Sequence, residues 1–174
     1  LKDRKLNAGE KNLLQKKDSG AVFVKTGGYS TFGTSTLYAL NALTGAVKWE
    51  KTFTDYNYTP FEMPAVMEGI IYLITGKPGY IYAIETETGN IRWASKIYDN
   101  DVLDSRATAP CIANGLLYFC GNGSDHESTS VFAYDINTGN RGWEKIITVY
   151  DYDGTLKKTT ANPTVANGFL YAFG

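Results

Sequence analysis

The stretch YAIETETGNIRW, residues 82–93, decides the fold because the chain repeats its pattern. Similar stretches are YALNALTGAVKW at residues 38–49 and FAYDINTGNRGW at residues 132–143. Each ends in Thr-Gly-x-x-x-Trp, which places tryptophans at positions 49, 93 and 143. Self-similarity with a period of roughly 40 to 50 residues indicates successive copies of one small structural unit.

Each copy contains up to four short segments that favour β-strand, which we call strands A, B, C and D in chain order. Strand C is the apolar run before the Thr-Gly turn, and strand D follows that turn and carries the tryptophan. Strand B is an apolar run after a turn glycine, and strand A begins at a proline, a residue that fits the start of a strand. The expected ranges are 64–66, 110–112 and 163–165 for A, 21–24, 70–74, 116–119 and 169–173 for B, and 37–41, 81–85 and 131–135 for C.

The turns and the apolar strands predict an all-β fold in which sheets stack on one another. Asn114-Gly115 and Asn167-Gly168 supply the positive φ angles of a two-residue hairpin turn between strands A and B. The B and C strands are almost continuously apolar, which indicates that both faces of each sheet are covered. Four-stranded antiparallel sheets packed in this way are the blades of a β-propeller.

The chain holds about three and a half such blades, so its ring is incomplete. The expected propeller spans residues 19–174, with blades at about 19–55, 63–100, 108–148 and 161–174. Residues 1–18 are rich in lysine and match strand A poorly; they form a frayed or partner-bound segment, a diverged strand near residues 12–17, or a solvated tail. Because open sheets leave faces and edges uncovered, we expect further blades, a second copy or other subunits to close the ring.

Composition excludes several classes of function. The 174 residues carry a net charge of −1, which provides no basic field for a nucleic acid. No apolar run approaches the roughly 20 residues of a membrane helix. Two cysteines, Cys111 and Cys120, are too few for a disulfide framework or a four-thiolate zinc site, and we expect both to be free thiols.

The repeat resembles the PQQ-like repeat of quinoprotein dehydrogenases and of the outer-membrane assembly lipoprotein BamB. The resemblance rests on Gly-x-x-Tyr followed by Ala-x-Asn/Glu/Asp-x-x-Thr-Gly-x-x-x-Trp and covers roughly residues 19 to 174. It implies a ring of about eight blades, in which each tryptophan docks between neighbouring sheets against the turn of an adjacent blade. Six residues are therefore expected to be structural: Gly45, Trp49, Gly89, Trp93, Gly139 and Trp143.

The loops between strands B and C and between strands D and A lie on one face of the ring and hold the unusual residues. Exposed aromatic rings there would bind protein or stack on sugars, and the alternative is that they only cap the blades. The candidate binding residues are Tyr29, Phe32, Tyr56, Tyr58, Tyr98, Asp101, Arg106, His126, Tyr150 and Tyr152.

Catalytic and metal sites are weakly indicated. Asp99, Asp101 and Asp104 form one acidic cluster and residues 151–154 another, but neither has the spacing of a calcium loop, so solvated turn aspartates are the expectation. His126 stands beside Ser124, Asp125 and Ser128, whereas triad members normally converge from separate segments. We therefore predict no catalytic residue, no metal and no cofactor.

The leading functional hypothesis is a non-enzymatic propeller that binds protein or polysaccharide through this loop face or serves as a structural subunit. The alternative is a piece of a PQQ-dependent dehydrogenase, with calcium and quinone ligands in other blades. Dehydrogenases of this type carry two adjacent cysteines near the cofactor, and this sequence has no Cys-Cys pair. Family resemblance implies a periplasmic, secreted or cell-surface location.

Overall fold

The computed structural model describes residues 20–26, 35–53, 63–76, 79–98, 107–123, 128–147, 149–150, 153–154, 156–157 and 161–172. All regular elements within these ranges are β-strands, which confirms the predicted all-β class. The N-terminal segment 1–18 lies outside them.

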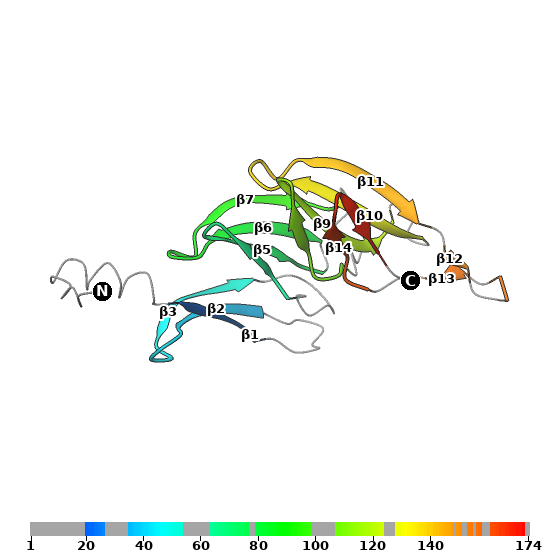
Figure 1. Ribbon diagram of the computed structural model, residues 1–174. Coiled ribbons are helices and arrows are strands. Elements are labelled where there is room, and N and C mark those ends of the chain that lie inside the picture. The colour runs from blue at the N-terminus through cyan, green and yellow to red at the C-terminus, as the bar shows by residue number, and fades with distance from the viewer. Residues whose placement is uncertain are drawn as a thin grey trace, which may run out of the picture.

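Three sheets stand in chain order and correspond to the first three predicted blades (Figure 1). The first consists of β1 (Ala21–Thr26), β2 (Ser35–Asn41) and β3 (Val47–Phe53). The second consists of β4 (Ala65–Met67), β5 (Ile70–Ile74), β6 (Tyr80–Glu85) and β7 (Ile91–Lys96). The third consists of β8 (Cys111–Ala113), β9 (Leu116–Asn122), β10 (Thr129–Asp135) and β11 (Arg141–Ile147).

Every neighbouring pair in these sheets is antiparallel and consecutive in the chain, as the A-to-D scheme predicts. The first sheet contains strands B, C and D, and the next two contain all four. Within the described residues, a fourth unit contributes strands A and B, as β14 (Thr164–Ala166) and β15 (Phe169–Tyr171). The chain is therefore an incomplete β-propeller.

The turns of the blades have left-handed backbone conformations, which the sequence predicted for the Asn-Gly turns. Gly45, Gly89 and Gly139 of the three Thr-Gly turns have φ angles of 71°, 72° and 73°, a region that glycine adopts without steric cost. Both residues of Asn114-Gly115 also have positive φ, the signature of a type I′ hairpin turn.

The pairing of strands C and D carries the same irregularity in all three blades. In the second blade Ala83 pairs with Trp93 and Ile84 pairs with Ile91, so Arg92 is an extra residue on strand D. Equivalent shifts follow Ala39 and Ala133. A bulge of this kind strengthens the local twist, and its recurrence before each tryptophan shows that the repeats match in detail.

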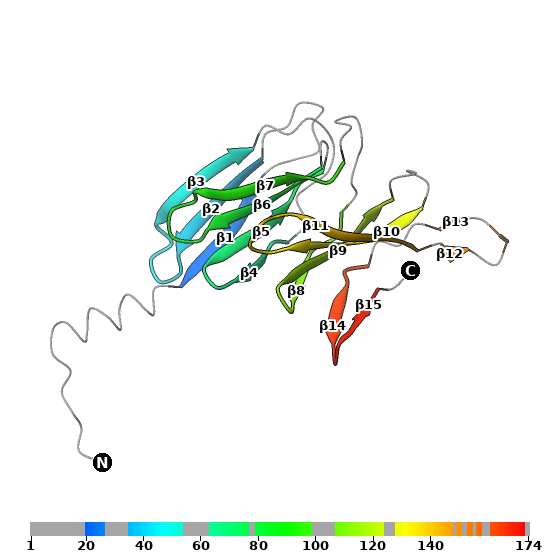
Figure 2. The same ribbon diagram turned by 90° about the horizontal axis from the view of Figure 1, so that it is seen from above.

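The core lies between the sheets, which stack face to face in both views (Figures 1 and 2). One cluster joins the first blade to the second through Leu37, Phe53, Ile71, Leu73 and Ile84. A larger cluster joins the second blade to the third and includes Ile74 and Ile81 on one side and Phe119, Phe132 and Tyr134 on the other. Strand β5 is buried along its whole length because both of its faces are covered.

The D-to-A connection between the third and fourth blades, on which Tyr150 is a candidate loop residue, contains a short hairpin. In it β12 (Val149–Tyr150) pairs with β13 (Leu156–Lys157). Gly154, with a φ of 81°, lies in the connection between them. In both views this hairpin projects away from the stacked sheets (Figures 1 and 2).

Candidate functional site

Most of the predicted loop-face residues fall outside the described ranges. Tyr150 belongs to β12 as part of its backbone. Tyr98 is the one candidate whose side chain the structure places. The candidates that lie outside the described residues are Tyr29, Phe32, Tyr56, Tyr58, Asp101, Arg106, His126 and Tyr152.

Tyr98 lies in the core and does not present its ring to solvent. Its side chain is 9% exposed, its ring meets Phe132 edge-on at a centroid distance of 6.1 Å, and its hydroxyl donates a hydrogen bond to the carbonyl of Asn122. The residue therefore joins the second blade to the third and caps the blade, which was the alternative interpretation of the aromatic residues.

Hydrogen bonds close the bases of two B-to-C loops where these loops leave their sheets. The amide of Thr75 donates to the carbonyl of Tyr80 at 2.8 Å, and the Thr75 hydroxyl accepts from the Tyr80 amide at 3.1 Å. In the third blade the Gly123 amide donates to the carbonyl of Ser128 at 2.9 Å. A backbone hydrogen bond thus joins the two strand ends between which the His126 loop lies.

The tryptophans of the first two blades dock on the next blade in the same way. The indole Nε1–H of Trp49 donates to the carbonyl of Thr86 at 2.9 Å, and that of Trp93 donates to the carbonyl of Ile136 at 3.0 Å. Both acceptors stand three residues before the glycine of a Thr-Gly turn. Trp49 and Trp93 therefore each make a contact between neighbouring blades.

The receiving glycines are required by close contact as well as by backbone conformation. A Cβ atom on Gly89 would lie 2.8 Å from the Trp49 ring, and one on Gly139 would lie 2.6 Å from the Trp93 ring. A Cβ on Gly45 would meet no atom within 4 Å. The Thr-Gly turn of the second and third blades is therefore the surface on which the preceding indole rests.

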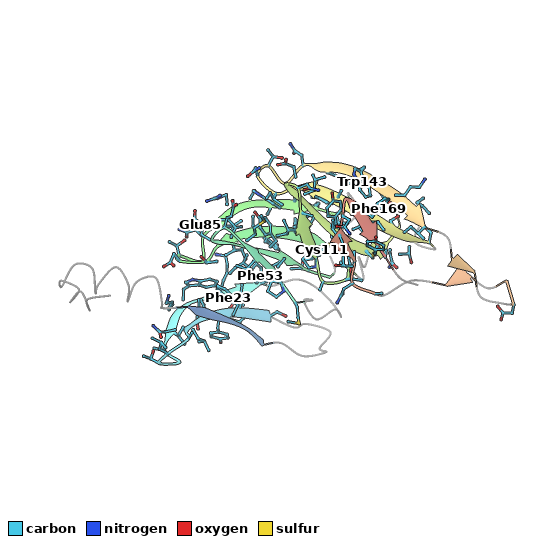
Figure 3. All side chains as sticks on the ribbon, in the orientation of Figure 1. Phe23, Phe53, Glu85, Cys111, Trp143 and Phe169 are labelled. Carbon is cyan, nitrogen blue, oxygen red and sulfur yellow. The ribbon has the colours of Figure 1, made fainter. Side chains whose placement is uncertain are left out.

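Trp143 has the same local setting but no such turn above it among the residues the structure describes. Its side chain is 40% exposed on β11, which Figure 3 marks, whereas Trp49 and Trp93 are partly buried. Among the described residues, Trp49 and Trp93 therefore contact a following blade, and Trp143 does not. The reason is that strands C and D of a following blade do not occur among the described residues.

An aromatic residue on strand B supports each indole, a feature that sequence reasoning missed. Phe23, Tyr72 and Tyr118 lie 6.0, 6.0 and 5.9 Å from their indoles, measured between ring centroids. The signal was available in the sequence, because these aromatics stand at equivalent places in the repeated B strands. In the second blade the Tyr72 hydroxyl also donates to the Ile136 carbonyl, at 3.4 Å.

Cys111 and Cys120 are free thiols, as predicted. Cys111 pairs with Tyr118 across β8 and β9, and Cys120 pairs with Val131. Burial raises the pKa of the Cys120 thiol to about 11, and the nearby Cys111 adds to the effect. Such thiols are poor nucleophiles near neutral pH.

Metal ligands do not gather anywhere in the described ranges: no group of three or more His, Cys, Asp and Glu side chains there could hold an ion. Of the acidic residues considered for calcium, only Asp153 is described, and it lies exposed beside Gly154. No helix in the same ranges is long and apolar enough to cross a membrane.

The comparison with protein families gives one match over most of the chain. The family model described as "Outer membrane protein assembly factor BamB" matches residues 7–174. None of the curated proteins matches the chain.

Several solved structures share the fold. A europium-containing methanol dehydrogenase is 25% identical with a TM-score of 0.53; the match covers 75% of this chain and 24% of that one. The quinohemoprotein alcohol dehydrogenase of Comamonas testosteroni is 18% identical with a TM-score of 0.54 over 80% of this chain and 21% of the other. The quinohemoprotein alcohol dehydrogenase ADHIIG of Pseudomonas putida HK5 is 21% identical with a TM-score of 0.50, over 75% and 20%. The chain thus spans a quarter or less of these proteins.

Proposed function

Because the chain belongs to the PQQ-like repeat family of β-propellers, we propose that it acts as a non-enzymatic scaffold or binding module within a larger propeller or assembly. The observation that supports this proposal most directly is that the residues repeated in each blade make contacts between blades. Trp49, Trp93, Gly89 and Gly139 all serve contacts between blades, and Trp143 offers one more contact of the same kind.

The binding surface in this proposal is the face that carries the B-to-C and D-to-A loops. Backbone hydrogen bonds join the strand residues on either side of two B-to-C loops, so the strands provide a rigid frame for these loops. Tyrosine supplies large rings at low entropic cost and suits protein or polysaccharide recognition. We assign the recognition to Tyr56, Tyr58 and Tyr152, with a periplasmic, secreted or cell-surface location in keeping with the family description.

Binding to insoluble polysaccharides would test this surface. The chain is sedimented with cellulose, chitin or peptidoglycan, and the triple variant Tyr56→Ala, Tyr58→Ala, Tyr152→Ala is expected to lose most of the bound fraction. Leu43→Ala is the matched control because Leu43 is 78% exposed on the opposite, C-to-D turn face. Equal binding by both variants would contradict the assignment of the loop face.

A second candidate function is a segment of a quinoprotein dehydrogenase, favoured by the methanol and alcohol dehydrogenases whose structures share its fold. The chain is incubated with PQQ and calcium and then passed over a gel-filtration column. We expect no quinone absorbance in the protein peak. Co-elution of one quinone per chain would overturn the non-enzymatic assignment.

A further inference from the structure

Strand D of the second blade breaks a charge pattern that the first and third blades share. Glu50 and Glu144 stand directly after the tryptophans of β3 and β11, whereas Ala94 follows the tryptophan of β7. The sequence of β7, IRWASK, holds two basic residues and no acidic one. One of the two, Arg92, forms an ion pair with Glu85 at 3.7 Å. The second blade therefore lacks the carboxylate that the repeat places on strand D.

An aromatic ring and a lysine stand side by side where this sheet meets its B-to-C loop. Tyr80, the first residue of β6, pairs with Lys96 of β7, and the Lys96 ammonium lies 5.8 Å from the centre of the Tyr80 ring. The equivalent pairs in the first and third blades are Thr36 with Thr52 and Ser130 with Ile146. The ring and the cation are thus specific to the second blade, and the repeated architecture does not require them.

Lys51 brings a second cation to the junction between the first and second blades. It stands on β3 between Trp49 and Phe53. The Trp49 indole donates to a carbonyl of the second blade, and the ring of Phe53, labelled at this junction in Figure 3, lies 5.0 Å from that of Tyr82. Because alternate residues of a strand share a face, Lys51 lies on the face that meets the second blade. It is partly buried there and forms no ion pair with any residue that the structure describes.

The place of the missing carboxylate lies beside two tyrosines. The rings of Tyr80 and Tyr82 stack at 5.7 Å and 26°, both residues are partly exposed, and the exposed Ala94 pairs with Tyr82. In the third blade the equivalent carboxylate, that of Glu144, accepts a hydrogen bond from Ser130 at 2.9 Å. A carboxylate brought by a ligand can take this place in the second blade, where the chain supplies cations and aromatic rings.

We propose that the junction beside strands C and D of the first two blades binds a carboxylated sugar unit of an acidic polysaccharide. The site consists of Lys51, Tyr80, Tyr82, Ala94 and Lys96. The sugar ring packs on the tyrosines, and its carboxylate pairs with the two ammonium groups where the other blades have a glutamate. This inference adds a site to the proposed binding module, names its substrate class and rests on that proposed function.

Oligosaccharides of matched structure test whether the site needs both parts of the ligand. Tetragalacturonate, an oligomer of carboxylated sugars, is titrated into the full chain in a calorimeter. Its methyl ester presents the same sugars without the charge, and tetraglutamate presents the charge without the sugars. We expect tetragalacturonate to bind at least about tenfold more tightly than either control, because each control lacks one of the two contacts.

The variants take residues that other blades have at the same positions, so the repeat accommodates them. Ala94→Glu restores the glutamate and should weaken binding at least about tenfold, because it places a like charge beside the ligand carboxylate. Lys96→Thr and Tyr80→Ser should each weaken binding about threefold. Since Lys96 is exposed, Lys96→Thr tests the site even if Tyr80→Ser does not fold. The matched control is Lys145→Ser, which removes an exposed lysine of the third blade and should bind like the parent chain.

Several outcomes would overturn the proposal. They are a tetragalacturonate titration without binding, a methyl ester or tetraglutamate that binds as tightly as tetragalacturonate, and equal affinities of the Ala94→Glu and Lys145→Ser variants. None of these would alter the sedimentation result for Tyr56, Tyr58 and Tyr152. Quinone retention in the gel-filtration test would overturn the proposed function and leave the titrations unchanged, so the two can fail separately.

Discussion

At the residue scale, the blades are held in register by a glycine and an indole that fit each other. The indole N–H donates a hydrogen bond to a backbone carbonyl, and the indole ring packs on the glycine. The contact therefore requires both a hydrogen-bond acceptor and a residue without a side chain. A side chain at the glycine would disturb both parts. The Thr-Gly turn therefore both connects two strands and forms the contact with the preceding blade.

Alanine substitutions separate the steric requirement from the conformational one. Gly45→Ala should destabilise the chain by about 1 to 2 kcal/mol, because alanine disfavours positive φ but meets no atom. Gly89→Ala has the same φ cost and also overlaps the Trp49 ring, which adds roughly 1 to 3 kcal/mol. Urea unfolding curves of the two variants measure the difference, and equal midpoints would refute the steric argument.

Phenylalanine substitutions measure the indole contact itself. Trp93→Phe removes the hydrogen bond to the Ile136 carbonyl and should cost about 1 to 3 kcal/mol. Trp143→Phe should cost less than about 1 kcal/mol, since its ring is 40% exposed. Thermal unfolding of both variants provides the measurement, and a larger loss for Trp143→Phe would contradict this account of the exposed face.

The carboxylate of Asp135 makes the stability of the third blade's Thr-Gly turn depend on pH. Its carboxylate accepts hydrogen bonds from the amides of Thr138 and Asn137 and from the Thr138 hydroxyl, and these hold its pKa below the usual 3.8. The folded-state pKa of Asp135 is lower than its unfolded-state pKa, so the ionised carboxylate stabilises the folded chain. This stabilisation is complete above pH 3.8 and is lost as the pH falls through the folded-state pKa.

Asp135→Asn should remove that pH dependence without removing the turn. Asn41 shows why: its side-chain oxygen accepts from the amides of Leu43 and Thr44 at 2.9 and 3.0 Å in the first blade. We expect the melting temperature of the parent chain to fall more steeply than that of the variant between about pH 5 and about pH 2. Parallel pH profiles would exclude a role for the carboxylate.

At the element scale, the strands differ in how completely their neighbours cover them. Strand β5 is buried at every position, whereas Val66 on the adjacent β4 is 52% exposed. Leu73→Ala on β5 should therefore cost about 2 to 5 kcal/mol, and Val66→Ala should cost less than about 1 kcal/mol. Chemical denaturation of the pair tests whether the core lies between the sheets.

The sequence predicted elements more completely than it predicted contacts. Repeated Thr-Gly turns, prolines and apolar runs located the A-to-D strands, because those signals depend on local backbone conformation. The burial of Tyr98 could not be read in this way, since it depends on Asn122 in another blade. The exposure of Trp143 likewise follows from what lies beside its blade, and the β12–β13 hairpin lacks the apolar pattern of the other strands.

At the scale of the whole molecule, stability should fall from the middle blades towards the fourth unit. The second blade is covered by a core cluster on each face, while β14 and β15 form only a two-stranded sheet. Hydrogen exchange should therefore be slowest in β5 and β6 and fastest in β14 and β15. Uniform protection along the chain would show that the described blades open only as a unit.

The direction of the indole contacts has a consequence for biosynthesis. Each tryptophan ends its own blade, and the turn that receives it comes later in the chain. During translation a finished blade thus presents its ring before the receiving turn has left the ribosome, and each new turn meets a partner already in place. We therefore expect the blades to assemble from the amino end, each on the blade that was made before it.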